Sequence, residues 1–262
     1  MAGSEGIDLN VDGDMDFATG NISEIVALMR GGSDVMTMTG GNGTGGPLLS
    51  IVVFLGGPGN DTADFGEVPD GVFYAGYGDD FAVAETGGLH FQGGSGDDVF
   101  IGGAGDNELS GGLGEDDLRG QGGDDLVIDD GLAERDRFSG GRGVDELWYV
   151  RHFHPNLRLS LDGVANDGVR GEDENIPSDF EHITLGDGND TFVGDDRSTT
   201  VFAGRGDDEV TGGGGRDRLY GEIGDDKFHT TDGHIDRILG GNGEDDATDR
   251  DAIDRVREVE RL

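Results

Sequence analysis

Large hydrophobic residues recur at every ninth position over much of this chain. Between residues 93 and 128 the sequence divides into four units, GGSGDDVFI, GGAGDNELS, GGLGEDDLR and GQGGDDLVI, and the eighth residue of each is hydrophobic. Because side chains alternate across a strand, a hydrophobic eighth residue between neighbours of mixed polarity predicts a short strand with that residue pointing inward. The eighth position is hydrophobic in sixteen such units: Ala82, Phe91, Phe100, Leu109, Leu118, Val127, Phe138, Leu147, Phe192, Val201, Val210, Leu219, Phe228, Ile238, Ala247 and Val256.

The nine-residue frame comes in two blocks, with a segment between them that lacks it. It runs unbroken over residues 66–128 and again over residues 185–229, and it resumes after one inserted residue. Repeats of this kind stack on their neighbours and need polar ends. We therefore expect degenerate N-terminal repeats or a cap at 1–46, a first repeat block at 47–148, an insert at 149–184 that continues the same architecture, and a second block with a C-terminal cap at 185–262.

The first six residues of each unit have the composition of a metal-binding turn. In the four units above, glycine fills positions 1, 2 and 4 with the exception of Gln121, and aspartate or asparagine fills position 6. Glycine suits a backbone with positive φ, or a carbonyl that must point inward with no Cβ in the way. Calcium takes about 6–8 oxygen ligands and accepts both carboxylates and carbonyls. One turn offers too few of these oxygens, so two turns must share an ion.

The template G-G-x-G-x-D-x-U-x, in which U is a large hydrophobic residue, resembles the nonapeptide of the hemolysin-type calcium-binding repeat (RTX) family. The resemblance implies an all-β fold, a right-handed parallel β-roll (β-solenoid) with two nonapeptides in each coil, and several calcium ions as cofactors. Turns n and n+2 then stack about 4.8 Å apart, close enough to share an ion. The surest shared ions lie between Asp80 and Asp98, between Asp98 and Asp116, between Asp208 and Asp226, and between Asp226 and Asp245. The full set of candidate calcium-binding residues is Asp61, Gly76, Gly78, Asp80, Gly94, Gly96, Asp98, Gly103, Gly105, Asn107, Gly112, Gly114, Asp116, Gly123, Asp125, Asp136, Asp145, Asp190, Gly204, Gly206, Asp208, Gly213, Gly215, Asp217, Gly224, Asp226, Asp236, Gly241, Gly243 and Asp245.

The charge of the chain favours metal cations as partners. With 57 acidic residues against 18 basic ones, the net charge of −39 predicts repulsion from nucleic acid and from anionic membranes. The same charge, together with 54 glycines, is also typical of a disordered acidic chain. The regular recurrence of a hydrophobic residue favours the folded alternative, because a disordered chain has no reason to keep that spacing.

Cysteine is absent, and the longest hydrophobic run, residues 51–55, is too short to span a membrane. A secreted protein without disulfides must be held together by something else, and bound ions can serve. We expect a secreted, extracellular monomer, although no signal peptide precedes the acidic start of the chain.

Two segments outside the regular repeats carry further expectations. At the N-terminus, Asp16 and Asp34 fall at position 6 of eroded repeats, and residues 22–29 between them predict a short helix or, as we favour, a strand. The insert contains RLSLDGVANDGVRGEDENI, which resembles an insert found in some actinobacterial members of the family, and residues 157–161 and 180–184 are expected to be strands. Its loop could bind a further calcium or be a solvated acidic loop; the residues concerned are Asp162, Asn166, Asp167, Glu172 and Asp173.

Other chemistry is weakly indicated. The zinc-protease motif H-E-x-x-H and the lipase motif G-x-S-x-G are both absent from the sequence. His152 and His154 could form a zinc pair or be surface or packing residues. Trp148 and Tyr149 could form a small sugar-binding patch or, as we favour, be separate surface aromatics. We expect a non-enzymatic, calcium-binding module that folds on binding calcium. The alternatives are the accessory repeat module of a secreted lipase, protease or polysaccharide epimerase, fused to its catalytic domain, and a surface adhesin.

Overall fold

The computed structural model describes residues 7–11, 14–18, 24–28, 31–37, 51–68, 70–130, 135–150, 156–169 and 174–261. All regular secondary structure in these residues is β-strand, and no helix among them is long and apolar enough to cross a membrane. The chain divides into two units, one of residues 1–127 with 140–143 and the other of residues 128–139 with 144–262. Strands β13 (Leu126–Asp129) and β14 (Arg137–Arg142) contain residues of both units.

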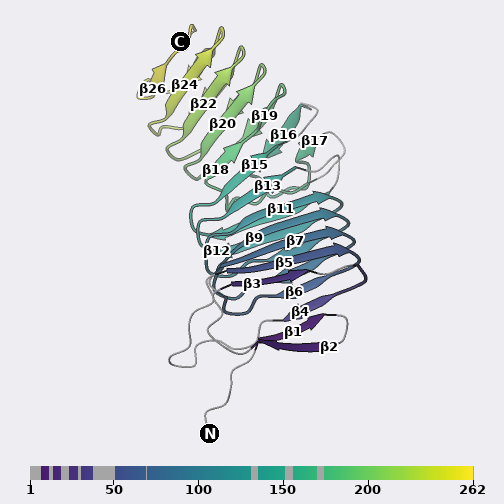
Figure 1. Ribbon diagram of the computed structural model, residues 1–262. Coiled ribbons are helices and arrows are strands. Elements are labelled where there is room, and N and C mark those ends of the chain that lie inside the picture. The colour runs from purple at the N-terminus through teal and green to yellow at the C-terminus, as the bar shows by residue number, and fades with distance from the viewer. Residues whose placement is uncertain are drawn as a thin grey trace. The chain divides into compact units, whose positions relative to one another are not determined.

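In the first unit, successive strands alternate between two parallel sheets, as the stacked arrows of Figure 1 show. Each strand pairs with the strand one coil away, so that His90 lies opposite Glu108 and Val99 lies opposite Asp117. This spacing of two nonapeptides per coil confirms the predicted parallel β-roll. One sheet contains β3 (Glu24–Leu28), β5 (Ile51–Pro58), β7 (Asp70–Tyr77), β9 (Gly88–Ser95) and β11 (Glu108–Leu113), and the other contains β4 (Val35–Thr37), β6 (Thr62–Asp64), β8 (Phe81–Val83), β10 (Val99–Ile101) and β12 (Asp117–Gly122).

The second unit repeats this architecture and includes the insert. Strands β16 (Leu157–Ser160) and β18 (His182–Thr184) pair with the strands of later repeats, so the two predicted insert strands do continue the roll. The short strand β17 (Gly168–Val169), which the sequence pattern did not predict, lies antiparallel to β16. The remaining strands are β15 (Glu146–Tyr149), β20 (Thr200–Arg205), β22 (Arg218–Ile223), β24 (Arg237–Asn242) and β26 (Arg255–Arg257) in one sheet, and β19 (Thr191–Val193), β21 (Glu209–Thr211), β23 (Lys227–Thr230) and β25 (Asp246–Arg250) in the other.

The hydrophobic column at position 8 forms the interior of both units. All sixteen of these residues are buried except Val256, which lies partly exposed on the last strand, β26. In the first unit aromatic rings stack along the interior, with ring centroids 5.7 Å apart for Phe73 and Phe91 and 5.1 Å apart for Phe91 and Phe100. Such ring pairs stabilise the core beyond the area they bury.

The N-terminal expectations are met only in part. Strand β3 confirms the predicted strand in residues 22–29. Asp34 is buried, and its backbone N–H donates to Asp61 at 2.8 Å, so Asp34 does belong to a turn of the roll. The expectation of a repeat turn at Asp16 is wrong, because Asp16 lies within β2 (Asp14–Ala18), which pairs antiparallel with β1 (Ile7–Val11). The hydrophobic alternation there serves a local hairpin.

The turns require an unusual backbone conformation at position 2. Gly94 has a φ of 111°, and a Cβ there would collide with the carbonyl oxygen of Gly76 in the neighbouring coil. Gln121 and Glu222 occupy the same position with φ values of 76° and 72°, a region that costs residues with a side chain about 1–2 kcal/mol. The stacked turns therefore impose this conformation even where glycine is absent. Among the predicted glycines, Gly103, Gly105 and Gly243 lack a positive φ, but a Cβ on each would meet backbone of the preceding coil.

Candidate metal centres

The position 6 carboxylates of successive coils lie in rows along each unit. We call these rows ladders, because each carboxylate accepts the backbone N–H of the position 6 residue one coil earlier. In the first unit the backbone N–H of Asp80 donates to Oδ1 of Asp98 at 2.7 Å, and the N–H of Asp98 donates to Oδ1 of Asp116 at 2.8 Å. In the second unit the N–H of Asp208 donates to Oδ1 of Asp226 at 3.0 Å, and the N–H of Asp226 donates to Asp245 at 2.9 Å. The four pairs expected from the sequence are therefore direct neighbours.

A second ladder lies on the opposite side of each coil. Asn107 and Asp125 form it in the first unit. In the second unit Thr199 donates its N–H to Asp217, and Asp217 donates to Asp236, both at 2.8 Å. Each aspartate thus uses one carboxylate oxygen to hold the backbone of the adjacent turn.

Two glutamates complete these ladders, and the sequence pattern did not identify them. Oε2 of Glu181 accepts the N–H of Asp145 at 2.9 Å, and Oε2 of Glu260 accepts the N–H of Asp245 at 2.8 Å. Glu181 lies in the insert and Glu260 follows the last repeat, so both fall outside the nine-residue frame. Their longer side chains reach the place that an aspartate occupies elsewhere.

In nine of the ladder aspartates the second carboxylate oxygen is buried without a hydrogen-bond partner in the described part of the chain. A Cβ on Gly221 would meet both Oδ2 of Asp226 and the carbonyl oxygen of Gly240, so this oxygen lies against a glycine of its own turn and near a carbonyl of the next coil. A buried oxygen without a partner is destabilising, and carboxylate and carbonyl oxygens are the ligands that calcium prefers. The residues present therefore fit the ion. The aspartates with such an Oδ2, each at most 2% exposed, are Asp61, Asp80, Asp98, Asp190, Asp208, Asp217, Asp226, Asp236 and Asp245.

Burial and crowding raise the pKa values of these carboxyls. Burial raises the pKa of Asp98 to about 8, against the N–H of Asp80, which lowers it, and the charges of Asp116 and Asp80 raise it further. For the same main reason the pKa of Asp208 and that of Asp226 rise to about 7. Because burial disfavours the charged form of a carboxylate, each of these groups tends to bind a proton or a cation.

Calcium affinity is expected to increase between pH 5.5 and 8. In the metal-free fold these carboxyls keep their protons up to about pH 7–8, whereas in the unfolded chain they lose them near 3.8. Their raised pKa values therefore favour the metal-free fold below about pH 4, and this contribution disappears as the pH rises through 7–8. Calcium must displace those protons, so calorimetry at pH 6 in two buffers of different ionisation enthalpy should detect proton release. An affinity that is the same at pH 5.5 and pH 8 would contradict this competition.

Asn107 differs from the aspartates, and its geometry argues against the calcium ion predicted there. Its Nδ2 donates to the carbonyl oxygens of Gly105 at 2.7 Å and Gly120 at 3.1 Å, and to Oδ1 of Asp125 at 2.7 Å. These hydrogen bonds occupy the carbonyl and carboxylate oxygens that would otherwise coordinate an ion. The turns that contain Asn107 and Asp125 are therefore joined by hydrogen bonds within the protein.

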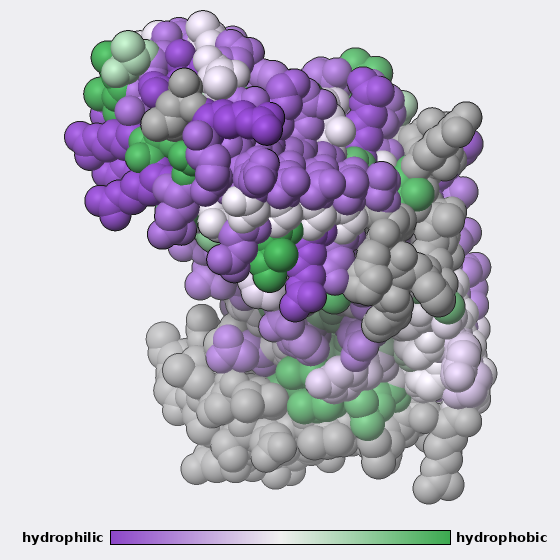
Figure 2. Space-filling model, turned by 90° about the horizontal axis from the view of Figure 1, so that it is seen from above, coloured by the Kyte–Doolittle hydropathy of each residue, from purple (hydrophilic) through white to green (hydrophobic). Residues whose placement is uncertain are grey.

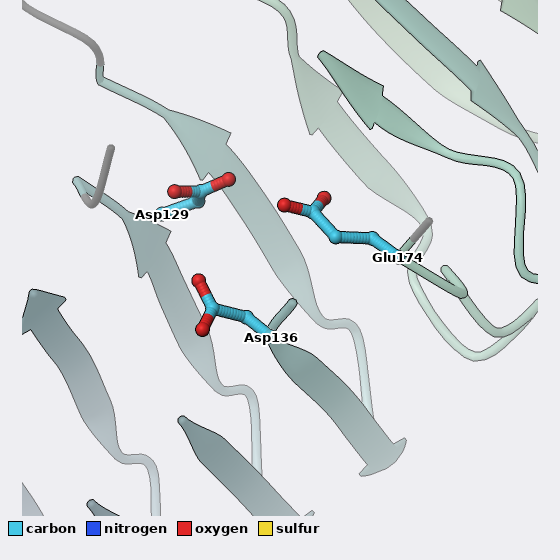
Figure 3. Close-up of side chains that lie close together, drawn as sticks. All are labelled: Asp129, Asp136 and Glu174. Carbon is cyan, nitrogen blue, oxygen red and sulfur yellow. The ribbon is translucent and has the colours of Figure 1, made fainter. Parts of the chain in front are cut away.

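Three further carboxylates converge in the second unit, where the side chains of Asp129, Asp136 and Glu174 point toward one another (Figure 3). Each offers an oxygen within 4.8 Å of the others, and all three residues are buried. The Tyr149 hydroxyl donates to Oε2 of Glu174 at 2.9 Å. Three charges at this distance favour a bound divalent cation or shared protons. Asp136 was predicted from the repeat frame, whereas Asp129 and Glu174 were not.

The structure bears on two expectations about other sites. Tyr149 is only 2% exposed, so it does not form a surface sugar-binding patch with Trp148. Asp167 in the insert accepts the N–H of Ser160 at 2.6 Å and the N–H of Ile176 at 2.9 Å, so both of its oxygens hold the loop together. Glu172, Asp173 and the pair His152 and His154 lie outside the described residues.

Comparison with protein families agrees with this geometry. The family model for the RTX calcium-binding nonapeptide repeat matches four copies, in residues 92–127 and 193–228. A search of curated proteins finds no match. The matched segments contain the central rungs of the ladders, including Asp98, Asp116, Asp208 and Asp226. The chain therefore contains RTX calcium-binding nonapeptide repeats on a parallel β-roll.

Proposed function

We propose that this chain is a secreted structural module that folds when it binds calcium and has no catalytic activity of its own. The observation that carries the proposal is the set of buried carboxylate oxygens without hydrogen-bond partners, which recurs at nine aspartates of the described ladders, Asp61, Asp80, Asp98, Asp190, Asp208, Asp217, Asp226, Asp236 and Asp245. Each turn with such an aspartate supplies one such oxygen and backbone carbonyls, and two adjacent turns of this kind together supply enough ligands for one ion. The residues that would hold ions are therefore shared between neighbouring coils.

Charge and core size make the fold dependent on those ions. Hydrophilic side chains cover most of the described surface on the face drawn in Figure 2, and most nonapeptides bury only one or two hydrophobic side chains in the interior. This small core must offset a backbone entropy cost of about 1–2 kcal/mol per residue, while stacked carboxylates repel one another. Bound cations remove the repulsion and join consecutive turns.

The expected affinity suits a protein that folds outside the cell. Extracellular calcium modules typically bind with dissociation constants of about 10⁻⁴–10⁻³ M, far above cytosolic calcium. Such a chain would remain unfolded inside the cell and fold after export. Repeats of this family are typically found in secreted proteins, which supports this location.

Metal analysis tests the proposal directly. After equilibrium dialysis against 1 mM calcium, we expect about four or more calcium ions per chain, from the aspartate pairs that lie side by side. The matched dialysis against 1 mM magnesium should give far less metal, because magnesium dehydrates reluctantly and demands octahedral geometry. Fewer than one calcium per chain would refute the function.

A further inference from the structure

Three arginines stand in register at the start of neighbouring strands in the second unit. Arg218 on β22 pairs with Arg237 on β24, which pairs with Arg255 on β26. Neighbouring strands lie about 4.8 Å apart, so the three exposed side chains leave the same edge of the sheet as a column. Arg216, two residues before Arg218, adds a fourth guanidinium group to this edge.

These four arginines differ from several cations of the described chain that pair with acidic residues. Arg119 pairs with Asp117 at 2.5 Å, and Lys227 pairs with Glu209 at 3.0 Å. Within the described part of the chain, none of the four guanidinium groups forms an ion pair within 4.0 Å or donates a side-chain hydrogen bond. Like charges directly opposite one another on paired strands are destabilising. A chain of net charge −39 has 57 acidic residues that could have neutralised them.

The four arginines also line a pocket. With Ile235 and Asp217 they enclose about 170 Å³. Asp217 is buried, and its Oδ1 accepts the N–H of Thr199, so this carboxylate belongs to the ladder inside the roll. Sites for drug-sized molecules occupy about 300–1,000 Å³, so this pocket suits a single small group.

We propose that this pocket binds an oxyanion group, a sulfate, phosphate or carboxylate. A guanidinium group is planar and presents several N–H donors, which can bind two oxygens of such a group at once. It is also weakly hydrated, so replacing its water with the anion costs little free energy. An anion between the arginines would also relieve the repulsion within the column. The group could come from a free ion or from an anionic polymer, and the net charge of the chain favours the free ion because it repels a polymer as a whole.

A competing role for the arginines is to offset the charges of the Asp217, Asp236 and Asp254 ladder behind them. In that case their loss would change calcium binding and leave no anion affinity to measure. The two roles therefore differ in whether an anion binds saturably. This inference is independent of the proposed calcium-dependent folding, and its test uses chain that is fully folded in calcium.

The test is calorimetric titration of the calcium-loaded full chain with sodium sulfate, with sodium chloride of equal ionic strength as the blank. We expect one saturable site. Arg237→Gln should weaken sulfate binding about tenfold, which corresponds to about 1.4 kcal/mol, and Arg218→Gln together with Arg237→Gln should abolish it. Arg237→Lys should give an intermediate loss, because it keeps the charge without the fork. The control is Arg205→Gln, which removes one positive charge at the far end of β20 and should leave the affinity unchanged.

The source of the oxyanion follows from a second titration with short dextran sulfate, with uncharged dextran as its control. Tighter binding of the polymer that depends on Arg237 supports the site with a polymer-borne ligand, and binding of sulfate alone supports it with a free ion. No saturable sulfate binding by the wild-type chain, or equal losses in Arg205→Gln and Arg237→Gln, would overturn the proposal. Circular dichroism in saturating calcium verifies that each variant is folded.

Discussion

Excess EDTA is expected to remove most of the β-sheet circular dichroism of this chain, and millimolar calcium is expected to restore it over a narrow concentration range. Ladder aspartates such as Asp98 and Asp226 are buried with one oxygen that has no hydrogen-bond partner among the described residues, and the pKa of Asp98 is raised to about 8 by burial. At pH 7.5 the metal-free fold must either hold protons or bury charge. Each ion that binds only the folded chain adds about 2.7 kcal/mol at a hundred times its dissociation constant. Several ions on shared ladders make the transition steep.

The controls separate ion binding from charge screening. Magnesium at the same concentration should restore little structure, because it demands octahedral geometry and dehydrates reluctantly. Sodium chloride at 0.5 M should not replace calcium either, because it screens charges but does not coordinate the buried oxygens. Identical β spectra with and without EDTA would show that the hydrophobic column alone holds the roll. The metal-free chain should also recover some structure near pH 4, where its ladder carboxyls are protonated.

The nine-residue frame was sufficient to predict the coil and most of the ladders. Phe91, Phe100 and their equivalents point inward because position 8 recurs on every strand, and Asp98 and Asp116 become neighbours because two units make one coil. These features are periodic, so each residue's place follows from its position in the repeat.

Features that depend on a single path of the chain could not be predicted in this way. Glu181 accepts the N–H of Asp145 because the path of the insert, which has no repeat pattern, brings it beside that turn. The same path places Glu174 beside Asp129. At Asp16 the local pattern resembled a repeat, but a tight antiparallel pairing with β1 was available and formed instead. The arginine column requires both the coil register and guanidinium groups that form no ion pair with the described residues, and only coordinates show the second.

Asp226→Asn is expected to weaken calcium binding and stabilise the metal-free fold, two effects of opposite sign. Asp226 is 1% exposed and lies between Asp208 and Asp245 in its ladder. Asparagine keeps the Oδ1 that accepts the N–H of Asp208, so the backbone ladder survives. Its amide replaces the unpartnered Oδ2 with a neutral donor, as Asn107 does naturally, and two ion sites each lose a charged ligand. We expect about two fewer calcium ions per chain, and a loss of about 3–5 kcal/mol in calcium-loaded stability.

The matched control is Asp225→Asn in the same turn. Asp225 is exposed, and its Oδ1 accepts the N–H of Glu244 at 2.8 Å, a bond that asparagine also keeps. Both variants therefore remove one negative charge and preserve one backbone acceptor, and they differ in burial and in the unpartnered oxygen. We expect Asp225→Asn to change stability by no more than about 0.5 kcal/mol. Urea unfolding in 5 mM calcium and metal analysis of both variants decide the matter. If the two behave alike, the ladder stabilises the roll through net charge, and the buried oxygens of position 6 are not calcium ligands.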